Sequence, residues 1–239
     1  MKKHLYEIFA DRWYHNGSIF VYSDPHFGDL DLYKKTHVKH VDLIHGKVFY
    51  ENGCNWEDGK SLEQSLKEFD DFKVERINSV VGKNDTLIIL GDVGDVSYVK
   101  KLRGYKVLLL GNHDSGASNY QRTYPYVEQY GDDEPITYGK DNHLFDEVYD
   151  GPLMVNDRLI LSHEPIENLP KYFFNIHGHD HSGANRGSNY LNVCCELLEL
   201  FKPFNLSSAL KDGLLSRIPS IHRSAIDTAN KRKSKKGTL

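Results

Sequence analysis

Two short apolar segments, separated by one short helical segment, constrain the fold of this chain more than any other feature. Residues 86–90 read Thr-Leu-Ile-Ile-Leu, residues 106–110 read Lys-Val-Leu-Leu-Leu, and residues 96–102 between them can form a short helix. Strands that are apolar along their length are buried on both faces, which is typical of a parallel sheet covered by helices. The sequence therefore predicts an α/β fold built around this unit.

Other segments extend the pattern along the chain. A strand is expected at residues 19–23, and a long amphipathic helix at 61–81, where Ser61 and Gln64 form a capping box before apolar residues at helical spacing. Shorter strands are expected at 145–149, 153–155, 159–162, 173–177 and 190–195, and a helix at 206–215. Turn sequences between the shorter strands predict a more antiparallel second half. Within the less regular stretch 29–60, a patch at 51–60 that contains Gly and Asn indicates an insertion or hairpin.

Length and composition favour one domain. The chain has 239 residues, 39% of them hydrophobic, and no linker or internal repeat divides it, so we predict one domain over 1–228 and a basic, disordered tail over 229–239. No apolar run approaches the roughly 18 residues that a transmembrane helix needs, and charged residues interrupt the N-terminal stretch where a signal peptide is apolar. Three cysteines are too few for a disulfide framework. A cytoplasmic protein with reduced thiols and no membrane contact is expected.

The net charge of −4 conceals an uneven distribution. Residues 202–239 hold nine Lys or Arg and two acidic residues, which leaves a charge of −11 on the first 201 residues. Much of the positive charge lies in the run Lys231, Arg232, Lys233, Lys235 and Lys236. Such a run at a terminus most often indicates a solvated tail, and its second interpretation is contact with nucleic-acid phosphates.

Potential metal ligands follow five of the predicted strands. They are Asp24 and His26 after the first strand, Asp92 after the second, Asn112 and His113 after the third, His163 after the strand at 159–162, and His179 and His181 after the strand at 173–177. Ligands of α/β sheets bind beyond the carboxyl ends of the strands, so these side chains are expected at one rim. Imidazole mixed with carboxylate favours Mn, Fe or Zn over soft metals.

Glycines and the remaining histidines complete this interpretation. Gly28, Gly91, Gly111 and Gly178 fit the tight turns that would hold the ligands close together. A set of merely structural polar residues would need many coincident partners at five strand ends, which makes the metal interpretation the stronger one. Five other histidines are interpreted as surface or packing residues: His37, His40, His45, His143 and His177. Of these, His177 is close enough in sequence to the last ligands to line the site.

Five short sequence blocks, in this order, resemble the calcineurin-like metallophosphoesterases. The blocks are Asp24-x-His26, Gly91-Asp92, Gly111-Asn112-His113-Asp114, Ser162-His163 and Gly178-His179-x-His181. They span residues 24–181, and the segment 102–114 is similar to the small bacterial and phage members. Asp180 departs from the pattern, because many members have Thr or Val there.

The resemblance implies a four-layer α/β/β/α sandwich of two mixed sheets, with a dinuclear metal site at the carboxyl-terminal rim of the strands. One metal would be bound by Asp24, His26 and His181, the other by Asn112, His163 and His179, and Asp92 would bridge the two. The two ions would be divalent or a mixed-valence pair. Mn is the first choice, with Fe and Zn as alternatives. Two such cations lower the pKa of a shared water enough to supply hydroxide for attack on a phosphoryl group.

The remaining candidates are catalytic and substrate-binding residues. His113 lies next to a ligand but belongs to neither set, so it is predicted to act as a general acid that protonates the leaving oxygen. Asp114 is predicted to orient the His113 ring through its other nitrogen. Arg186 and Asn185, just beyond the last block, are candidates for phosphate contacts, although a solvated loop explains them equally well.

The expected function is hydrolysis of a phosphomonoester or phosphodiester, with nucleotides and nucleic acids among the candidate substrates. One alternative is a metal-dependent nuclease whose basic tail binds phosphates. A second is a non-catalytic scaffolding subunit of the same fold. Loss of ligand residues would indicate a scaffold, and the sequence retains every ligand position.

Overall fold

The apolar segments of the sequence form the centre of a five-stranded sheet. In the computed structural model, its order is β13 (Phe204–Asn205), β1 (Ile19–Tyr22), β4 (Thr86–Ile89), β5 (Tyr105–Leu109) and β8 (Glu147–Tyr149). β1, β4, β5 and β8 pair in parallel, and β13 pairs with β1 in the antiparallel direction. Residues 13, 17–35, 40–42, 47–49, 62–114, 122–123, 137–138, 144–220, 225 and 228 are described. They confirm a mixed α/β fold.

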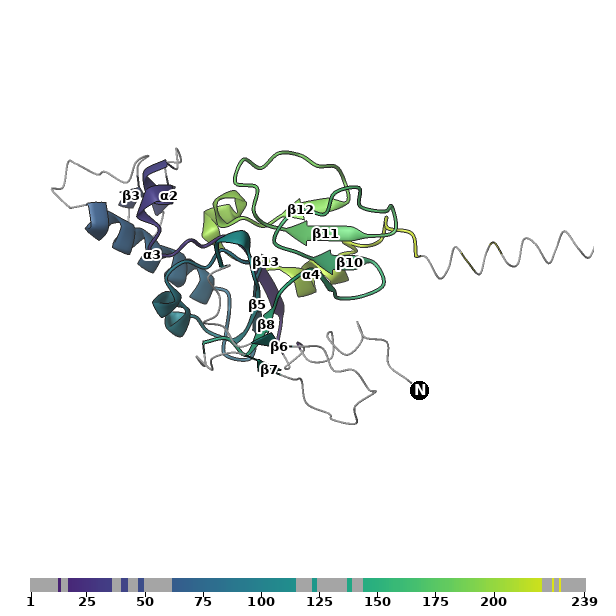
Figure 1. Cartoon of the computed structure of the whole chain (residues 1–239), viewed down its shortest axis with the longest axis horizontal. Helices are drawn as coiled ribbons and strands as arrows, with labels where there is room; N and C mark the ends of the chain where they lie inside the picture. The colour runs from purple at the N-terminus through teal and green to yellow at the C-terminus, as the bar shows by residue number, and fades with distance from the viewer. Residues whose placement is uncertain are drawn as a thin grey trace, which may run out of the picture.

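A second sheet has the order β12 (Tyr190–Asn192), β11 (Phe174–His177), β10 (Leu159–Leu161) and β9 (Leu153–Met154). β10, β11 and β12 pair in parallel, and β9 alone is antiparallel (Figure 1). The prediction of a more antiparallel second half therefore holds for the pair β9 and β10 and is wrong for β10, β11 and β12. Residues 162–173 and 178–189 each supply about the dozen residues that a parallel crossover needs, whereas a tight turn joins β9 to β10.

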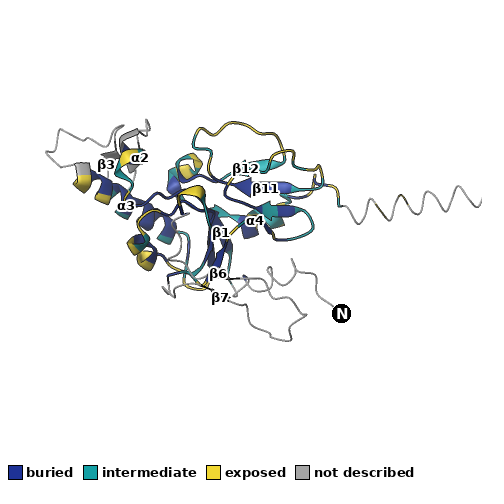
Figure 2. Ribbon diagram, viewed as in Figure 1, coloured by how far each residue is buried: buried dark blue, intermediate teal, exposed yellow. Residues whose placement is uncertain are grey.

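Alternation along each strand produces two separate apolar clusters. Ile19 and Val21 face the second sheet, where they join apolar residues of β9, β10 and β11, and the burial colours of Figure 2 show this interior. Phe20 and Tyr22 face the other way, onto α3 (Leu62–Asn78) and the 3₁₀ helix η3 (Val96–Lys101). Period-two alternation of buried residues on both faces requires a covering layer on each side of the first sheet.

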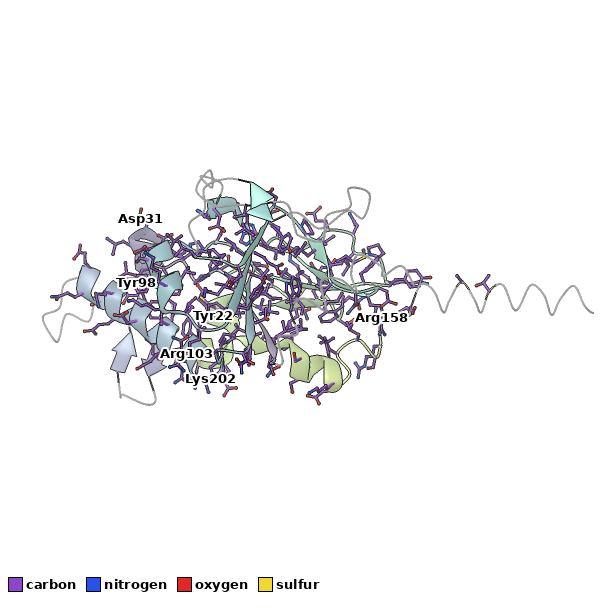
Figure 3. All side chains as sticks on the ribbon, turned by 90° about the horizontal axis from the view of Figure 1, so that it is seen from below. Tyr22, Asp31, Tyr98, Arg103, Arg158 and Lys202 are labelled. Atoms are coloured by element: carbon purple, nitrogen blue, oxygen red, sulfur yellow. The ribbon has the colours of Figure 1, made fainter. Side chains whose placement is uncertain are left out.

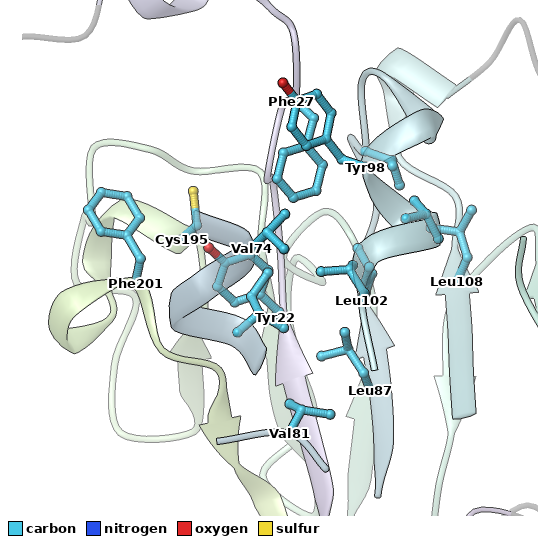
Figure 4. Packing of buried hydrophobic residues seen from close by; sticks show 14 of the residues in the cluster. Tyr22, Phe27, Val74, Val81, Leu87, Tyr98, Leu102, Leu108, Cys195 and Phe201 are labelled. Atoms are coloured by element: carbon cyan, nitrogen blue, oxygen red, sulfur yellow. The ribbon is translucent and has the colours of Figure 1, made fainter. Parts of the chain in front are cut away.

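The helical side of the first sheet is packed with aromatic rings. Figure 4 shows Tyr22 of β1 beside Val74 of α3, with Leu87 of β4 in the same cluster. It also shows Phe27 and Tyr98, whose stacked rings have centroids 5.0 Å apart. In the turned view of Figure 3, Tyr22 lies centrally, Asp31 and Tyr98 lie at the end that holds α3, and Arg158 lies toward the opposite end. The long predicted helix is thus confirmed as the cover of this face.

Residues 162–173 contact the outer face of the second sheet at β11 and β12. The buried Asn175 side chain donates to Ser162 Oγ at 2.9 Å and accepts from the Ile166 amide at 3.0 Å, which fixes that segment on β11. Tyr190 OH donates to Ile166 O at 2.8 Å. No described residue places a helix on this face, so the fourth layer stays a prediction.

Several short elements complete the fold. Residues 30–49 contain α2 (Leu30–Lys35) and an antiparallel pair of β2 (His40–Asp42) and β3 (Lys47–Phe49). The patch at 51–60, where the insertion or hairpin is expected, lies outside the described residues. The other short elements are η4 (Asn112–Asp114), β6 (Arg122–Thr123), β7 (Thr137–Tyr138), η6 (Cys195–Leu197), η7 (Glu199–Phe201) and α4 (Leu206–Lys211). α4 ends earlier than predicted because Asp212 caps it and Gly213, at φ 90°, turns the backbone out of the helix.

Some sequence predictions fall outside the described residues. They include Cys54, His37, His45, His143 and the tail over 229–239. Within the described residues Cys194 and Cys195 are buried free thiols, as expected for reduced cysteines. None of the helices described combines the length and apolar character needed to cross a bilayer.

Candidate metal centre

The carboxyl ends of five strands bring all seven predicted ligands to one rim. Asp24 and His26 follow β1, Asp92 follows β4, Asn112 lies in η4 after β5, His163 follows β10, and His179 and His181 follow β11. The two sheets therefore both contribute ligands. Each ligand side chain has an oxygen or nitrogen within 4.0 Å of a ligand atom on another of the seven. The predicted convergence at one rim is confirmed.

Asp24, His26 and His181 form the first group of ligands. Asp24 Oδ1 lies 4.0 Å from His26 Nε2 and 3.7 Å from His181 Nε2. One ligand atom from each of the three residues lies within 4.8 Å of the other two, so the three side chains could bind one cation. Asp24 is fully buried, so its carboxylate needs an electrostatic partner.

Asn112, His163 and His179 form the second group. His163 Nε2 lies 2.8 Å from Asn112 Oδ1, and His179 Nδ1 lies 3.0 Å from Asn112 Oδ1 and 3.2 Å from His163 Nε2. Donors held about 2.1 Å from one ion are separated by about 3.0–3.4 Å, which is close to these distances.

The tautomer of His163 supports the same interpretation. Its Nδ1 donates to the Leu90 carbonyl at 2.7 Å, so Nε2 carries a lone pair directed at the second group. Asn112 Oδ1 is also a lone-pair acceptor, and two acceptors 2.8 Å apart repel each other. A shared cation would convert this repulsion into attraction for both atoms.

Asp92 lies between the two groups. Its Oδ2 is 3.5 Å from His26 Nε2 of the first group and 3.5 Å from His163 Nε2 of the second. The other oxygen, Oδ1, accepts a hydrogen bond from the backbone amide of His113 at 2.9 Å. One carboxylate oxygen is therefore available to both groups at equal distance, while the other anchors the loop after β5.

Two buried polar atoms at the rim lack hydrogen-bond partners among the described residues. They are Asp24 Oδ1 and His26 Nε2, both of the first group, and their side chains are at most 8% exposed. A buried polar atom without a partner is costly, and such exceptions often indicate an ion or water site. A divalent cation between these atoms would satisfy both, so the donor set fits a metal.

The backbone of the rim is also unusual. Four of the seven ligands have positive φ angles: Asp24 at 56°, His26 at 41°, Asp92 at 54° and His179 at 65°. Residues other than glycine adopt this left-handed region infrequently, at a cost of order 1–3 kcal/mol each, and such residues cluster at functional sites. This concentration at one rim is a structural indication of function that sequence spacing did not reveal.

Glycines allow the ligand loops to approach each other. A Cβ atom at Gly91 would lie 2.5 Å from the Gly111 amide nitrogen and 2.7 Å from His163 Nδ1. A Cβ atom at Gly178 would overlap Ser23 Oγ and Asp24 Oδ2. These contacts confirm the close approach expected at the glycines.

A buried ion pair on α3 supports the loop that bears Asp24 and His26. Lys73 is 3% exposed, lies 2.8 Å from Asp70 Oδ1 and donates to the Pro25 carbonyl at 2.6 Å. Asp70 Oδ2 accepts from the Gly28 amide at 2.8 Å. Burial raises the pKa of Asp70, opposed by the Lys73 charge. Sequence analysis missed this pair because spacing alone does not separate buried from exposed pairs on a helix.

Replacing Lys73 with methionine is expected to lower the free energy of unfolding by about 3 kcal/mol, because Asp70 would remain buried without its cation. Lys67→Met is the matched control: Lys67 pairs with Asp71 at 2.8 Å on the exposed side of the same helix, and its loss should leave stability nearly unchanged. Urea denaturation of both full-length variants in chelator measures the difference. Equal stability of the two variants would contradict a supporting role for Lys73.

Electrostatics favour a cation at the first group. Burial lowers the pKa of His26, which favours the neutral imidazole that binds metals. A hydrogen bond to Glu196 raises the pKa of His181 to about 9. The carboxylates of Glu196, Asp24 and Asp92 that raise this pKa would also attract a metal cation, which must displace the proton from Nε2 to bind there.

The structure assigns Asp114 a role different from the predicted one. Its Oδ2 accepts from the backbone amides of Asp92 at 2.7 Å and Gly111 at 2.9 Å, and its Oδ1 accepts from Val93 at 3.1 Å. These bonds fix the loops after β4 and β5 to each other. The predicted contact with the His113 ring is replaced because three backbone donors converge on the carboxylate.

His113 lies beside the first group. Its side chain is exposed, and its ring centroid is 5.4 Å from that of His26 in an edge-on arrangement. The side chain can therefore reach a molecule bound at the rim, while the backbone amide holds Asp92. Its role as an acid stays a prediction.

Arg186 and Asn185 lie in the exposed segment that follows His181. Asn185 Oδ1 accepts from the Gly187 amide at 2.8 Å, and an Arg186 guanidinium nitrogen lies 3.7 Å from Asp180 Oδ2. These contacts are local to their loop, so their binding of phosphate stays a prediction. His177, expected near the site, is buried on β11, and its Nδ1 lies 2.9 Å from the Gly178 carbonyl oxygen.

No protein-family model matches the sequence, and no curated protein matches it. Among solved structures, the crystal structure of AQ665, a protein of unknown function from Aquifex aeolicus, is similar. Its sequence identity is 20% and its TM-score 0.47, over 82% of this chain and 99% of that chain. This likeness assigns no activity.

Proposed function

We propose that this chain is a metal-dependent phosphoesterase that uses two divalent ions to hydrolyse a phosphomonoester or phosphodiester. The observation that carries the proposal is the position of Asp92 Oδ2, 3.5 Å from a ligand atom of each group. A shared carboxylate is the means by which proteins hold two dications about 3.5–4 Å apart. The proposal includes the four-layer sandwich, whose carboxyl-terminal rim would present the site.

The ligand residues of the rim form two groups, each of which would bind one ion. Asp24, His26 and His181 would bind one ion, and Asn112, His163 and His179 the other. Mn is the first choice, with Fe and Zn as alternatives, because the donor set is imidazole and oxygen without a required thiolate. Bound ions of this kind acidify water and neutralise phosphoryl oxygens during in-line displacement.

The protein supplies a proton donor to complete the reaction. His113 is exposed and lies beside the first group, where its ring can face the leaving oxygen of a bound ester. A protonated imidazole at that position would donate a proton as the bond to phosphorus breaks. The Asp114 carboxylate keeps the two ligand loops in register through its three backbone contacts.

A substrate screen on the metal-loaded protein tests this proposal. p-Nitrophenyl phosphate reports monoesterase activity, and bis-p-nitrophenyl phosphate and 2′,3′-cyclic nucleotides report diesterase activity. Activity that requires Mn and disappears in chelator supports the proposal. Absence of metal uptake would overturn it, and metal uptake with no turnover of any phosphate ester would favour the scaffolding alternative.

The basic run at residues 231–236 favours one alternative, a nuclease, and truncation tests it. We expect removal of all residues after Asn230 to change neither small-diester turnover nor nucleic-acid binding, because the predicted ligands lie upstream. Binding of single-stranded DNA across a salt series checks this. Each phosphate that the tail neutralises would add about one counterion to the salt slope, so markedly weaker binding with a smaller slope after truncation would promote the nuclease.

A further inference from the structure

The segment Cys194–Cys195–Glu196 lies against the first ligand group. It follows β12, and Cys194 forms a parallel bridge with Ser23 at the end of β1. The Cys195 amide donates to the Ser23 carbonyl at 3.0 Å. These backbone contacts hold the segment directly beside Asp24.

Side chains of this segment contact two of the three ligands in that group. Cys194 Sγ donates to Asp24 Oδ2 at 3.2 Å, which leaves Oδ1 as the oxygen that faces His26 and His181. Cys195 Sγ donates to the Asp24 carbonyl at 3.1 Å. The His179 amide also donates to Asp24 Oδ2, at 2.8 Å, so Cys194 and this amide together fix which carboxylate oxygen of Asp24 faces the other ligands.

Glu196 contacts the second of these ligands. Its Oε1 lies 3.0 Å from His181 Nδ1, while Nε2 of the same ring lies 3.7 Å from Asp24 Oδ1. The Glu196 side chain is 11% exposed, and its other oxygen has no hydrogen-bond partner among the described residues. A carboxylate on the far nitrogen of a metal-binding histidine fixes the ring and makes it a better ligand.

We propose that Glu196 is the positioning residue of the first metal group, orienting His181 through Nδ1, while Cys194 orients Asp24. This inference rests on the proposed function, because it requires the first group to bind an ion. The second group is oriented differently, since His163 Nδ1 donates to the Leu90 carbonyl rather than to a carboxylate. Loss of Glu196 should therefore weaken one ion and spare the other.

The test is competitive titration of the full-length, metal-free protein with Mn²⁺ and Zn²⁺, without any substrate. Glu196→Ala should lower the affinity for one ion by about 10–100-fold and leave the affinity for the other unchanged. Glu196→Gln keeps an oxygen that accepts from Nδ1 but removes the charge, so an intermediate loss is expected. Glu199→Gln, at an exposed position three residues later, is the matched control and should bind both ions as wild type.

Electron paramagnetic resonance of the Mn-loaded variants supplies a second readout. The spectra are recorded with two Mn²⁺ added per chain, at a protein concentration just high enough for wild type to bind both. Under these conditions wild type should show the spectrum of a spin-coupled Mn²⁺ pair. Glu196→Ala should show isolated Mn²⁺ from the second group. A general loss of structure would weaken both ions together, and Glu196→Gln tests the inference should the alanine variant fold poorly.

The outcomes separate the inference from the function on which it rests. Two ions in wild type with one weakened selectively in Glu196→Ala support it. Two ions in wild type with unchanged affinities in both Glu196 variants would overturn the inference alone, and so would equal weakening of both ions in a Glu196→Gln variant that unfolds at the wild-type temperature. Uptake of a third ion that Glu196→Ala abolishes would make Glu196 a ligand and overturn its positioning role. No metal uptake by wild type would overturn both proposals.

Discussion

Replacement of Asp92 by alanine is expected to reduce hydrolysis to background and to lower metal content at both groups. The reason is geometric, because Asp92 Oδ2 is equidistant, at 3.5 Å, from His26 Nε2 and His163 Nε2. Without the shared carboxylate, two dications at the rim would repel each other unopposed. Metal content by elemental analysis and turnover of a p-nitrophenyl ester, measured on the same preparation, check this result.

Asp95→Ala provides a control on the same loop. Asp95 is exposed and caps η3 by accepting from the Ser97 amide at 2.9 Å, so its loss should spare both ions. Full metal occupancy with near-normal turnover in Asp92→Ala would contradict the bridging assignment. Loss of metal in both variants would indicate that metal binding depends on an intact loop after β4 rather than on the Asp92 carboxylate as a bridge.

Replacement of His113 by alanine should separate catalysis from metal binding. The hydrogen bond to Asp92 comes from the His113 backbone amide, at 2.9 Å, so alanine preserves it and both ions should remain. Turnover of esters with poor leaving groups should fall on the order of 10²–10⁴-fold, the scale of general acid catalysis. Aryl esters, whose leaving group needs little protonation, should lose much less.

A comparison of alkyl and p-nitrophenyl esters in the same assay measures this difference. Metal content at wild-type level is the internal control, because loss of an ion would slow both substrates. Equal losses on the two esters with both ions present would remove the acid role from His113. The residue would then be assigned to binding.

The convergence of the ligands was predictable because each of them follows a predicted strand. Residues 87–90 and 107–110 are apolar throughout, and parallel strands deliver their carboxyl ends to one edge. The position of a ligand just after a strand was therefore enough to predict one rim, but not the strand order or the contact between Asp92 and His163 across the two sheets. The division of the seven ligands between two ions rests on the resemblance to the calcineurin-like metallophosphoesterases and on the proposed function.

Contacts between distant segments were not predictable in the same way. Glu196 meets His181 fifteen positions away, and Lys73 meets Pro25 forty-eight positions away. Neither side chain has a spacing that distinguishes it from an exposed charge. The predicted partner of Asp114 was wrong for a related reason. Almost every residue carries a backbone amide, so the sequence does not show which amides converge on the Asp114 carboxylate.

The parallel direction of β10, β11 and β12 in the second sheet could not be predicted from the sequence pattern either. Turn residues near β9 correctly indicate one reversal, but the long segments between β10, β11 and β12 contain no helical periodicity that would indicate a crossover. Residues 162–173 cross over as an irregular segment fixed by Asn175. Side-chain hydrogen bonds replace the helix that usually covers such a connection.

Anomalous diffraction from crystals grown with Mn²⁺ would locate the ions at the rim. A pair of ions bridged by Asp92 should give two peaks about 3.5–4 Å apart, on either side of Asp92 Oδ2. One should lie among Asp24, His26 and His181, and the other among Asn112, His163 and His179. A single peak, a peak pair that excludes Asp92, or no ordered Mn²⁺ at the rim would contradict a carboxylate-bridged pair of ions.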